Sequence, residues 1–111
     1  MPSRFEPCGL NQIYSMIYGT LPIVRATGGL EDTVLGYSAL DKSGDGCKFF
    51  DATPSALYNT IGWACSVWYD NPADIAMLRQ NAMAKDFTWS RSADEYERLY
   101  GWAVEQRKGA F

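Results

Sequence analysis

The 111-residue sequence contains no histidine, only three cysteines, and no apolar run of the roughly 20 residues that a membrane-spanning helix needs. The missing histidine removes the commonest zinc ligand and the usual general base of serine and cysteine hydrolases. Cys8, Cys47 and Cys65 are odd in number and lack Cys-x-x-Cys spacing. This pattern argues against a disulfide framework and fits a reducing compartment.

Basic residues are also few, with 10 Lys and Arg against 13 Asp and Glu, for a formal net charge of -3. They are scattered along the chain, whereas binding to a phosphate backbone needs them clustered. We therefore expect no nucleic-acid partner. Met1 leads directly into a polar motif with no signal-peptide pattern, so we expect a soluble cytoplasmic protein without a membrane partner.

The first part of the chain, residues 1–52, alternates between helix and strand signals. Apolar residues at helical spacing predict a helix from Leu10 that stops at Gly19. A short buried strand is expected over Leu21–Val24 and a second over Cys47–Asp51. A glycine turn with a short helix and then a polar surface loop fill the space between these strands. The helical face that we expect to be buried consists of Leu10, Ile13, Tyr14 and Ile17.

The second part, residues 53–111, reads as all helical. Thr53-Pro54 and Asn71-Pro72 each combine a capping residue with a first-turn proline, and Ser92 with Glu95 forms a capping box. These signals predict three helices, the second of which ends near Ala84. Their expected inner faces are Leu57, Ile61, Ala64, Cys65 and Trp68, then Ile75, Leu78 and Ala82, and finally Tyr96, Leu99, Tyr100 and Ala103.

The fold class predicted by this order is α/β, a single partial domain with few parallel strands followed by a helical tail. A parallel strand such as Leu21–Val24 needs neighbours on both sides. The sequence offers no strand ahead of the first helix. We therefore expect the chain to be a piece of a larger protein.

Two glycine-containing blocks carry most of the functional information, PSRFEPCGL over residues 2–10 and TGGLEDT over residues 27–33. Each places glycine where a loop turns into a helix, so that backbone N–H groups and the positive helix end can face an anion. A diphosphate suits such a site. The Glu6 carboxylate, just ahead of the first turn, can accept hydrogen bonds from sugar hydroxyls. A sugar joined to a diphosphate suggests glycosyl transfer.

The run PSRFEPCGLNQIYSMIYGTLPIVRATGGLEDTV resembles the C-terminal domain of bacterial glycogen synthases and plant starch synthases, and DFTWSRSADEYERLY resembles their closing helices. The resemblance covers essentially the whole chain. It implies the C-terminal part of a Rossmann-like domain of the GT-B type. In such an enzyme two domains close over ADP-glucose, and glucose is added with retention to the non-reducing end of an α-1,4-glucan. The enzyme would be cytoplasmic, or plastidial if the source is a plant.

By this resemblance, Glu6 is the catalytic residue and holds the donor glucose hydroxyls. The backbone of Cys8, Gly9 and Leu10 would face the same glucose, and the block Thr27–Gly29 would cradle the diphosphate. No cofactor or metal is implied, since an oxocarbenium-like transition state needs a positioned sugar and a stabilised leaving phosphate. The partners implied are ADP-glucose, the glucan and the N-terminal GT-B domain of the same enzyme.

Some features of the family are missing or different in this chain. Its Lys-x-Gly-Gly-Leu loop, a histidine near the sugar and a basic pair on the phosphates match nothing here, so we expect the chain alone to be inactive. Many GT-B relatives carry a second glutamate eight residues after the first, to bind the ribose, and this chain has Tyr14 there. Glycogen and starch synthases lack that glutamate too, which favours this family.

Other interpretations remain open at this stage. The chain can be a standalone, non-catalytic module that binds a nucleotide sugar or a glucan, or part of a GT-B transferase with a different nucleotide.

Asp41-x-Ser43-x-Asp45-Gly46 imitates half of an EF-hand loop, but Ala52 stands where its last glutamate belongs, so we expect a solvated turn. Arg25 reads as a surface charge at a strand end. Aromatic residues at helical spacing read mainly as core, with Trp102 as the best candidate for surface sugar binding.

Overall fold

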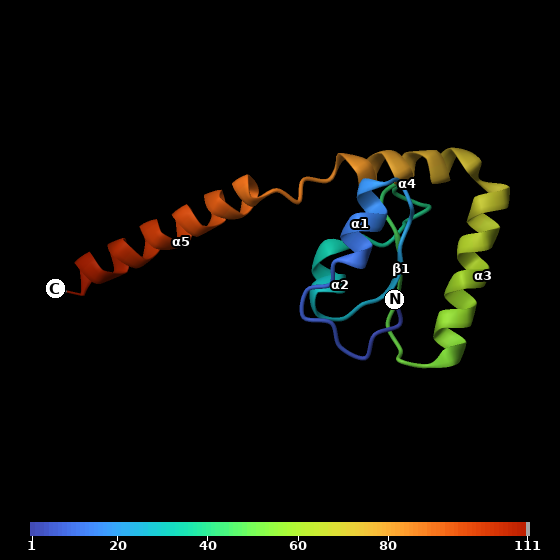
Figure 1. Ribbon diagram of the computed structural model, residues 1–111, viewed down its shortest axis with the longest axis horizontal. Coiled ribbons are helices and arrows are strands. Elements are labelled where there is room, and N and C mark those ends of the chain that lie inside the picture. The colour runs from blue at the N-terminus through green and yellow to red at the C-terminus, as the bar shows by residue number, and fades with distance from the viewer. Residues whose placement is uncertain (111) are drawn as a thin grey trace.

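The computed structural model describes residues 1–110, which form two short strands and five helices. Figure 1 shows both strands, α1 and α2 gathered in one body, with α3 along one side of it and α4 across its end. The elements in chain order are α1 (Asn11–Ile17), β1 (Ile23–Arg25), α2 (Gly28–Thr33), β2 (Cys47–Phe49), α3 (Pro54–Asp70), α4 (Pro72–Ala84) and α5 (Trp89–Gly109).

The two strands form a parallel pair, which confirms the predicted α/β class. Ile23 pairs with Cys47 and Arg25 with Phe49. Parallel neighbours need a crossover connection, and here α2 and the loop after it supply that connection. Both strands overlap their predicted ranges, but each is only three residues long, and β1 begins two residues later than predicted and includes Arg25.

The opposite edge of β1 is also hydrogen-bonded, by the first residue of the chain. The Met1 amino group donates to the Ile23 carbonyl oxygen at 2.6 Å, and the Arg25 N–H donates to the Met1 carbonyl oxygen at 3.0 Å. Such a pair of bonds, on either side of Val24, joins neighbouring strands of a parallel sheet. Met1 therefore occupies the position of a third strand beside β1.

Helix boundaries follow the predicted signals in most places. Gly19, at φ 72°, ends α1, and its N–H donates to the Met16 carbonyl oxygen at 3.0 Å. The Thr53 hydroxyl accepts a hydrogen bond from the Ala56 N–H at 3.2 Å and so caps α3. The predicted capping box is wrong, because α5 begins at Trp89 and Ser92 lies inside the helix.

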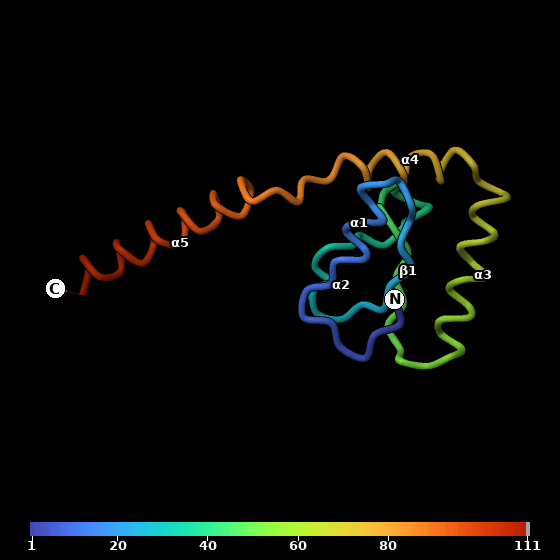
Figure 2. Tube along the Cα trace, in the orientation of Figure 1, coloured from blue at the N-terminus to red at the C-terminus, as the bar shows by residue number. Residues whose placement is uncertain are grey.

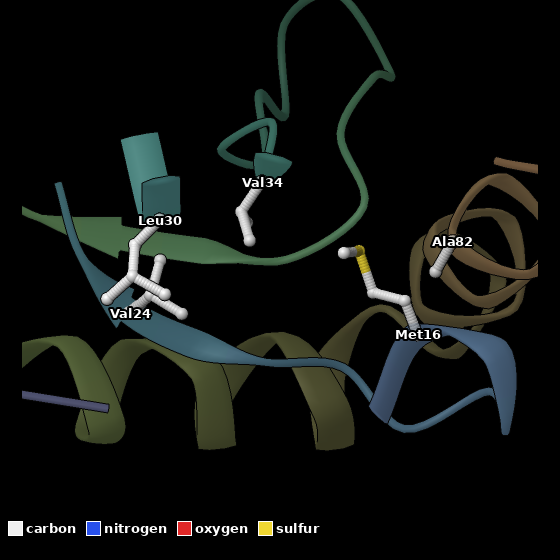
Figure 3. Close-up of a cluster of buried hydrophobic side chains, with 5 residues drawn as sticks. All are labelled: Met16, Val24, Leu30, Val34 and Ala82. Atoms are coloured by element: carbon white, nitrogen blue, oxygen red, sulfur yellow. The ribbon is translucent and has the colours of Figure 1, made fainter. Parts of the chain in front are cut away.

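The main hydrophobic core lies between α1, α2, β1 and α4. It consists of Met16, Val24, Leu30, Val34 and Ala82, as Figure 3 shows. A second cluster, made by Tyr37, Val67 and Leu78, joins the loop after α2 to α3 and α4. Leu78 and Ala82 are buried and Ile75 is half-buried, which confirms the predicted inner face of α4.

The predicted buried face of α1 is wrong. Leu10, Tyr14 and Ile17 are exposed, whereas Gln12 and Met16 point inward with no exposed surface. The predicted helical period is correct, but the face that meets α2 and α4 is turned away from the apolar stripe. The apolar stripe of α1 consequently faces outward in this chain.

The predicted stripe of α3 is likewise only partly covered. Ile61, Cys65 and Trp68 are exposed. Among residues 54–70, which form α3, only Val67 is buried. Between α3, β1 and α4 lies an open groove of about 430 Å³, lined mainly by apolar side chains. Leu21, Ile23, Ile61, Trp68 and Ile75 contribute to its wall.

The last helix, α5, runs away from the rest of the molecule (Figures 1 and 2). None of its 21 residues is buried, and its predicted inner face of Tyr96, Leu99 and Tyr100 is exposed. The radius of gyration is 17.4 Å, whereas a compact chain of this length has about 13 Å. Within residues 1–110, no helix is long and apolar enough to cross a membrane.

Candidate nucleotide-sugar site

The two glycine blocks of the sequence meet directly in the structure. The Gly29 N–H, in the first turn of α2, donates to the Glu6 carbonyl oxygen at 2.8 Å. A Cβ atom built on Gly29 would lie 2.2 Å from the Cys8 carbonyl oxygen, and one on Gly28 would lie 2.1 Å from the Glu6 carbonyl oxygen. Both glycines are therefore required by the close approach of two backbones.

This contact changes the role that the sequence suggests for Gly29. Its N–H was expected to face an anion, but it is already occupied by the Glu6 carbonyl oxygen. The N–H groups of Leu30 and Glu31 also have a partner, the carbonyl oxygen of Thr27. The second glycine block thus holds the first block in place, in addition to any contact that it makes with a ligand.

The side chain of Glu6 is available for a ligand. Glu6 is half-buried, and its carboxylate has no hydrogen-bond or ion-pair partner within residues 1–110. Cys8 and Leu10 are exposed, and Gly9 is half-buried at φ 76°. The predicted residues of the first block therefore form an accessible loop beside α2.

The second predicted set sits at the start of α2. Thr27 is the N-cap residue of this helix, with extended backbone, and its hydroxyl makes no capping hydrogen bond. Thr27 and Gly28 are half-buried, whereas Gly29 is buried. The structure thus brings all the predicted site residues to one region, in which Glu6–Leu10 and Thr27–Gly29 are neighbours.

Gln12 is a part of this region that the sequence analysis missed. It is fully buried, and its Nε2 donates to the carbonyl oxygens of Cys8 and Gly9, each at 3.0 Å. The same Nε2 lies 3.1 Å from the Thr33 hydroxyl oxygen, so its two hydrogens are shared among three acceptors. The sequence signal is weak, namely a polar residue four positions before Met16, on the face that proves to be buried.

Arg25 was expected to be a surface charge, and the structure corrects this. Its Nε donates to the Phe50 carbonyl oxygen at 2.9 Å, and its Nη1 donates to the carbonyl oxygens of Arg4 at 2.7 Å and of Ser3 at 3.3 Å. Three backbone acceptors in two loops thus share one guanidinium group. Arg25 ties the segment ahead of Glu6 to the end of β2.

The far end of α2 is fixed by a partly buried ion pair. Lys85 Nζ donates to the Asp45 carboxylate and to the Thr33 carbonyl oxygen, both at 2.6 Å, and the same carboxylate accepts from the Leu35 N–H at 2.7 Å. Asp45 is buried, so the turn that resembles half an EF-hand is not the solvated turn that was expected. It anchors the loop and α2 to the end of α4.

A second polar cluster ties the same loop to α4. The Tyr37 hydroxyl donates to the Asp74 carboxylate, and Lys42 Nζ donates to that carboxylate at 2.7 Å. The hydrogen bond to this carboxylate, helped by burial and by the negative charge of Asp74, raises the pKa of Tyr37 to about 12. Hydrogen bonds from Lys42 and Tyr37 hold the pKa of Asp74 below its usual range. Trp63 stacks on Tyr37 with ring centroids 5.4 Å apart.

All three cysteines are free thiols in the structure. Cys8 and Cys65 are exposed, whereas Cys47 is buried in β2. Burial raises the pKa of the Cys47 thiol to about 11. In residues 1–110, no cluster of three or more Cys, Asp or Glu side chains is arranged to hold a metal ion.

Comparison with known proteins gives this arrangement its context. The chain is 53% identical over 109 residues to glycogen synthase 1 of Geobacter sulfurreducens. The matched region covers 98% of this chain and 22% of that protein. It is 48% identical over 107 residues to the glycogen synthase of Treponema denticola, covering 96% of this chain and 22% of the relative. The chain thus spans about a fifth of the length of these curated relatives. No protein-family model matches the chain.

Among solved structures, the chain is similar to the catalytic domain of starch synthase IV from Arabidopsis thaliana bound to ADP and acarbose. The TM-score is 0.74 at 34% sequence identity, over 94% of this chain and 22% of that one. The parallel strands, their crossover and the two loops at the site define the chain as a portion of a GT-B glycosyltransferase catalytic domain. More particularly, it belongs to the glycogen synthase and starch synthase family.

Proposed function

We propose that this chain supplies the donor-sugar part of the active site of a glycogen or starch synthase. The complete enzyme would transfer glucose from ADP-glucose to the non-reducing end of an α-1,4-glucan, with retention of the anomeric configuration. The observation that carries this proposal is the contact between Glu6 and Gly29, which joins the two predicted donor-binding blocks in one accessible site. The names of the relatives and the ADP bound to the starch synthase support it.

In this proposal the carboxylate of Glu6 accepts hydrogen bonds from the hydroxyls of the donor glucose. The exposed loop Cys8–Leu10 lies along the same sugar, and Thr27 and Gly28 face the diphosphate. Gly29 acts through the backbone contact that holds the loop. As the bond from the anomeric carbon to the diphosphate breaks, positive charge develops on the sugar, so that a carboxylate fixed nearby stabilises the transition state.

We also propose that the chain is one partial domain of a longer enzyme and inactive alone. Two surfaces support a covering by the rest of that enzyme. The apolar groove along α3 is open, and α5 presents exposed aromatic side chains. Exposed apolar surface of this extent is typical of an interface.

The experiment that tests the proposed function uses the complete reading frame that contains these residues. Its product is supplied with a glucan primer and either ADP-glucose or UDP-glucose, and the new linkage is read by its susceptibility to an α-1,4-specific glucanase. We expect α-1,4-linked glucose from ADP-glucose, and no transfer by residues 1–111 alone. Transfer from UDP-glucose only would favour a GT-B enzyme with a different nucleotide, and absence of transfer from both would contradict the proposal.

A standalone binding module is the second candidate. The observation in its favour is that both blocks are assembled by hydrogen bonds within residues 1–110. Equilibrium binding of ADP to the isolated chain, combined with its oligomeric state, separates the two candidates. Saturable binding by a stable monomer favours the module, whereas a chain that fails to fold or that associates through its open groove favours the partial domain.

A further inference from the structure

Gln12 is the most deeply buried polar side chain near the candidate site. Its exposed fraction is 0%, and its Nε2 contacts the carbonyl oxygens of Cys8 and Gly9 and the Thr33 hydroxyl at 3.0 to 3.1 Å. Its Oε1 has no hydrogen-bond partner within residues 1–110. Rotating the amide by half a turn would set Oε1 against two carbonyl oxygens, so the orientation is fixed by its acceptors.

The hydrogen bonds around Gln12 form a closed circuit that links the two blocks. The Thr33 hydroxyl, which accepts from Gln12, donates to the Gly29 carbonyl oxygen at 2.6 Å. The Gly29 N–H donates in turn to the Glu6 carbonyl oxygen at 2.8 Å. From Glu6 the chain runs through Cys8 and Gly9 back to the acceptors of Gln12. The same amide therefore fixes the loop and the helix against each other.

We propose that Gln12 is a positioning residue for glycosyl transfer, which sets the donor-sugar loop Glu6–Leu10 at a fixed distance from α2. This inference rests on the proposed function. In this proposal Gln12 does not contact the donor sugar and acts on it only by holding the loop backbone. Together with the hydrogen bond from Gly29 to Glu6, this link fixes the place of Glu6 relative to Thr27 and Gly28.

The link matters because the loop has few other restraints. Cys8 and Leu10 are exposed, and Gly9 has a left-handed backbone. Within residues 1–110, the only other hydrogen bond between this loop and α2 is the one from Gly29 to Glu6. An error of about 1 Å in the placement of a reacting group costs about a hundredfold in rate. Loss of the Gln12 amide should therefore weaken donor use and leave glucan binding unchanged.

The test compares variants of the complete enzyme. Gln12→Met keeps the length of the side chain and removes its donors, and Gln80→Met makes the same change at an exposed position of α4. We expect Gln12→Met to lower kcat/KM for the nucleotide sugar by about 10- to 100-fold, with KM for the glucan within about twofold of wild type. Gln80→Met should match wild type in both parameters.

Substitutions of Thr33 test the same hydrogen-bond circuit independently. Thr33→Val removes the hydroxyl that connects Gln12 to Gly29, and Thr33→Ser keeps it. We expect the valine variant to be impaired in donor use, the serine variant to be restored, and the double variant Gln12→Met/Thr33→Val to be no worse than Gln12→Met. If Gln12→Met yields no folded enzyme, the Thr33 pair alone decides the question.

Three outcomes overturn the inference. The first is a donor kcat/KM of Gln12→Met within twofold of wild type. The second is a Thr33→Ser variant as impaired as Thr33→Val. The third is an equal loss toward donor and glucan, which indicates general damage. Hydrogen exchange at the Gly29 amide, measured on the same proteins, gives a readout without activity, and Gln12→Met should speed it at least tenfold. If wild type transfers no glucose, the proposed function fails, and the exchange rate still decides whether Gln12 fixes the loop against α2.

Discussion

The Gly29 N–H donates a hydrogen bond of 2.8 Å to the Glu6 carbonyl oxygen, across 23 residues of chain. This bond places the start of α2 directly against the loop that carries the candidate catalytic carboxylate. The crossover from β1 to β2 contains α2, so the parallel topology itself brings the two segments together. The site is thus formed by the fold of residues 1–50, and α3 to α5 lie outside it.

The first prediction concerns the close approach at Gly29. Gly29→Ala should destabilise the protein by about 3 kcal/mol, because the added Cβ would lie 2.2 to 2.6 Å from three backbone atoms of Cys8. The matched variant is Gly62→Ala in the interior of α3, where a Cβ would meet nothing within 4 Å. This control should stabilise the protein by about 0.5 to 1 kcal/mol. Urea unfolding measures both, and equal midpoints for the two variants would contradict the close packing of Gly29 on Cys8.

The second prediction concerns the partly buried ion pair at the end of α4. Lys85→Met should lower the free energy of unfolding by about 3 kcal/mol, because it leaves the Asp45 carboxylate buried and without its cation. Lys108→Met, at an exposed position of α5, should change it by no more than about 0.5 kcal/mol. The comparison uses denaturant midpoints at neutral pH. A Lys85 variant as stable as the control would mean that the pair contributes nothing.

The third prediction is a dependence of stability on alkaline pH. The pKa of Tyr37 is raised from 10 to about 12, so the folded state holds this proton more tightly than the unfolded state. The stability from this proton is complete below pH 10 and is lost as the pH rises through about 12. The difference in unfolding midpoint between wild type and Tyr37→Phe should therefore shrink from pH 10 upward. Tyr58→Phe, at an exposed position, should track wild type throughout.

The same cluster also makes the stability depend on acidic pH, where stability is lost as the pH falls. Because the folded-state pKa of Asp74 is below the ordinary value of 3.8, its contribution is complete above that value. It is lost as the pH falls through the lowered pKa. An Asp74→Asn variant should consequently lose less stability than wild type on acidification below pH 3.8, the ordinary pKa of the carboxyl.

The fourth prediction uses the three thiols as probes of the fold. Cys8 and Cys65 are exposed and should react with Ellman's reagent quickly, whereas Cys47 should react only when the protein unfolds. Its burial and a pKa of about 11 keep it protonated and inaccessible. Samples labelled with Ellman's reagent at increasing urea concentrations should show the third reactive thiol, Cys47, only where the protein unfolds. Rapid labelling of all three thiols without urea would show that β2 is not buried as described.

Local signals predicted the elements well. Thr53 with Pro54 marked the start of α3, Pro72 marked that of α4, and Gly19 marked the end of α1. Capping and proline geometry depend on neighbouring residues, so a single sequence reveals them. The Ser92 and Glu95 pair failed because the same residue types are also common inside exposed helices, where they cap nothing.

Burial was predicted less well, because it depends on what covers each face. The stripes Leu10–Ile17 of α1 and Ile61–Trp68 of α3 have the right spacing, yet much of each stripe is exposed. Periodicity identifies an apolar face but not the element that packs on it. Gln12 shows the reverse case, since its burial is decided by carbonyl oxygens of the Cys8 and Gly9 backbone that no sequence pattern displays.

The site residues were named from two short blocks, and the structure shows that the blocks are adjacent. The sequence did not reveal that Gly28 and Gly29 are needed for backbone packing, or that Arg25 holds the segment before Glu6. Both facts arise from contacts between segments more than 20 residues apart, which local spacing does not encode. Donor binding by these residues stays a prediction.

The most direct test of the account is the turnover of Glu6→Ala in the complete enzyme, beside Asp70→Ala as a matched control. Asp70 is an exposed carboxylate at the end of α3, remote in the chain from both blocks. With ADP-glucose and a glucan primer, Glu6→Ala should lose at least 100-fold in kcat, about 2.7 kcal/mol of transition-state stabilisation, with an unchanged unfolding midpoint. Asp70→Ala should keep wild-type turnover. Near wild-type turnover of Glu6→Ala would contradict the assignment of this loop to the donor sugar.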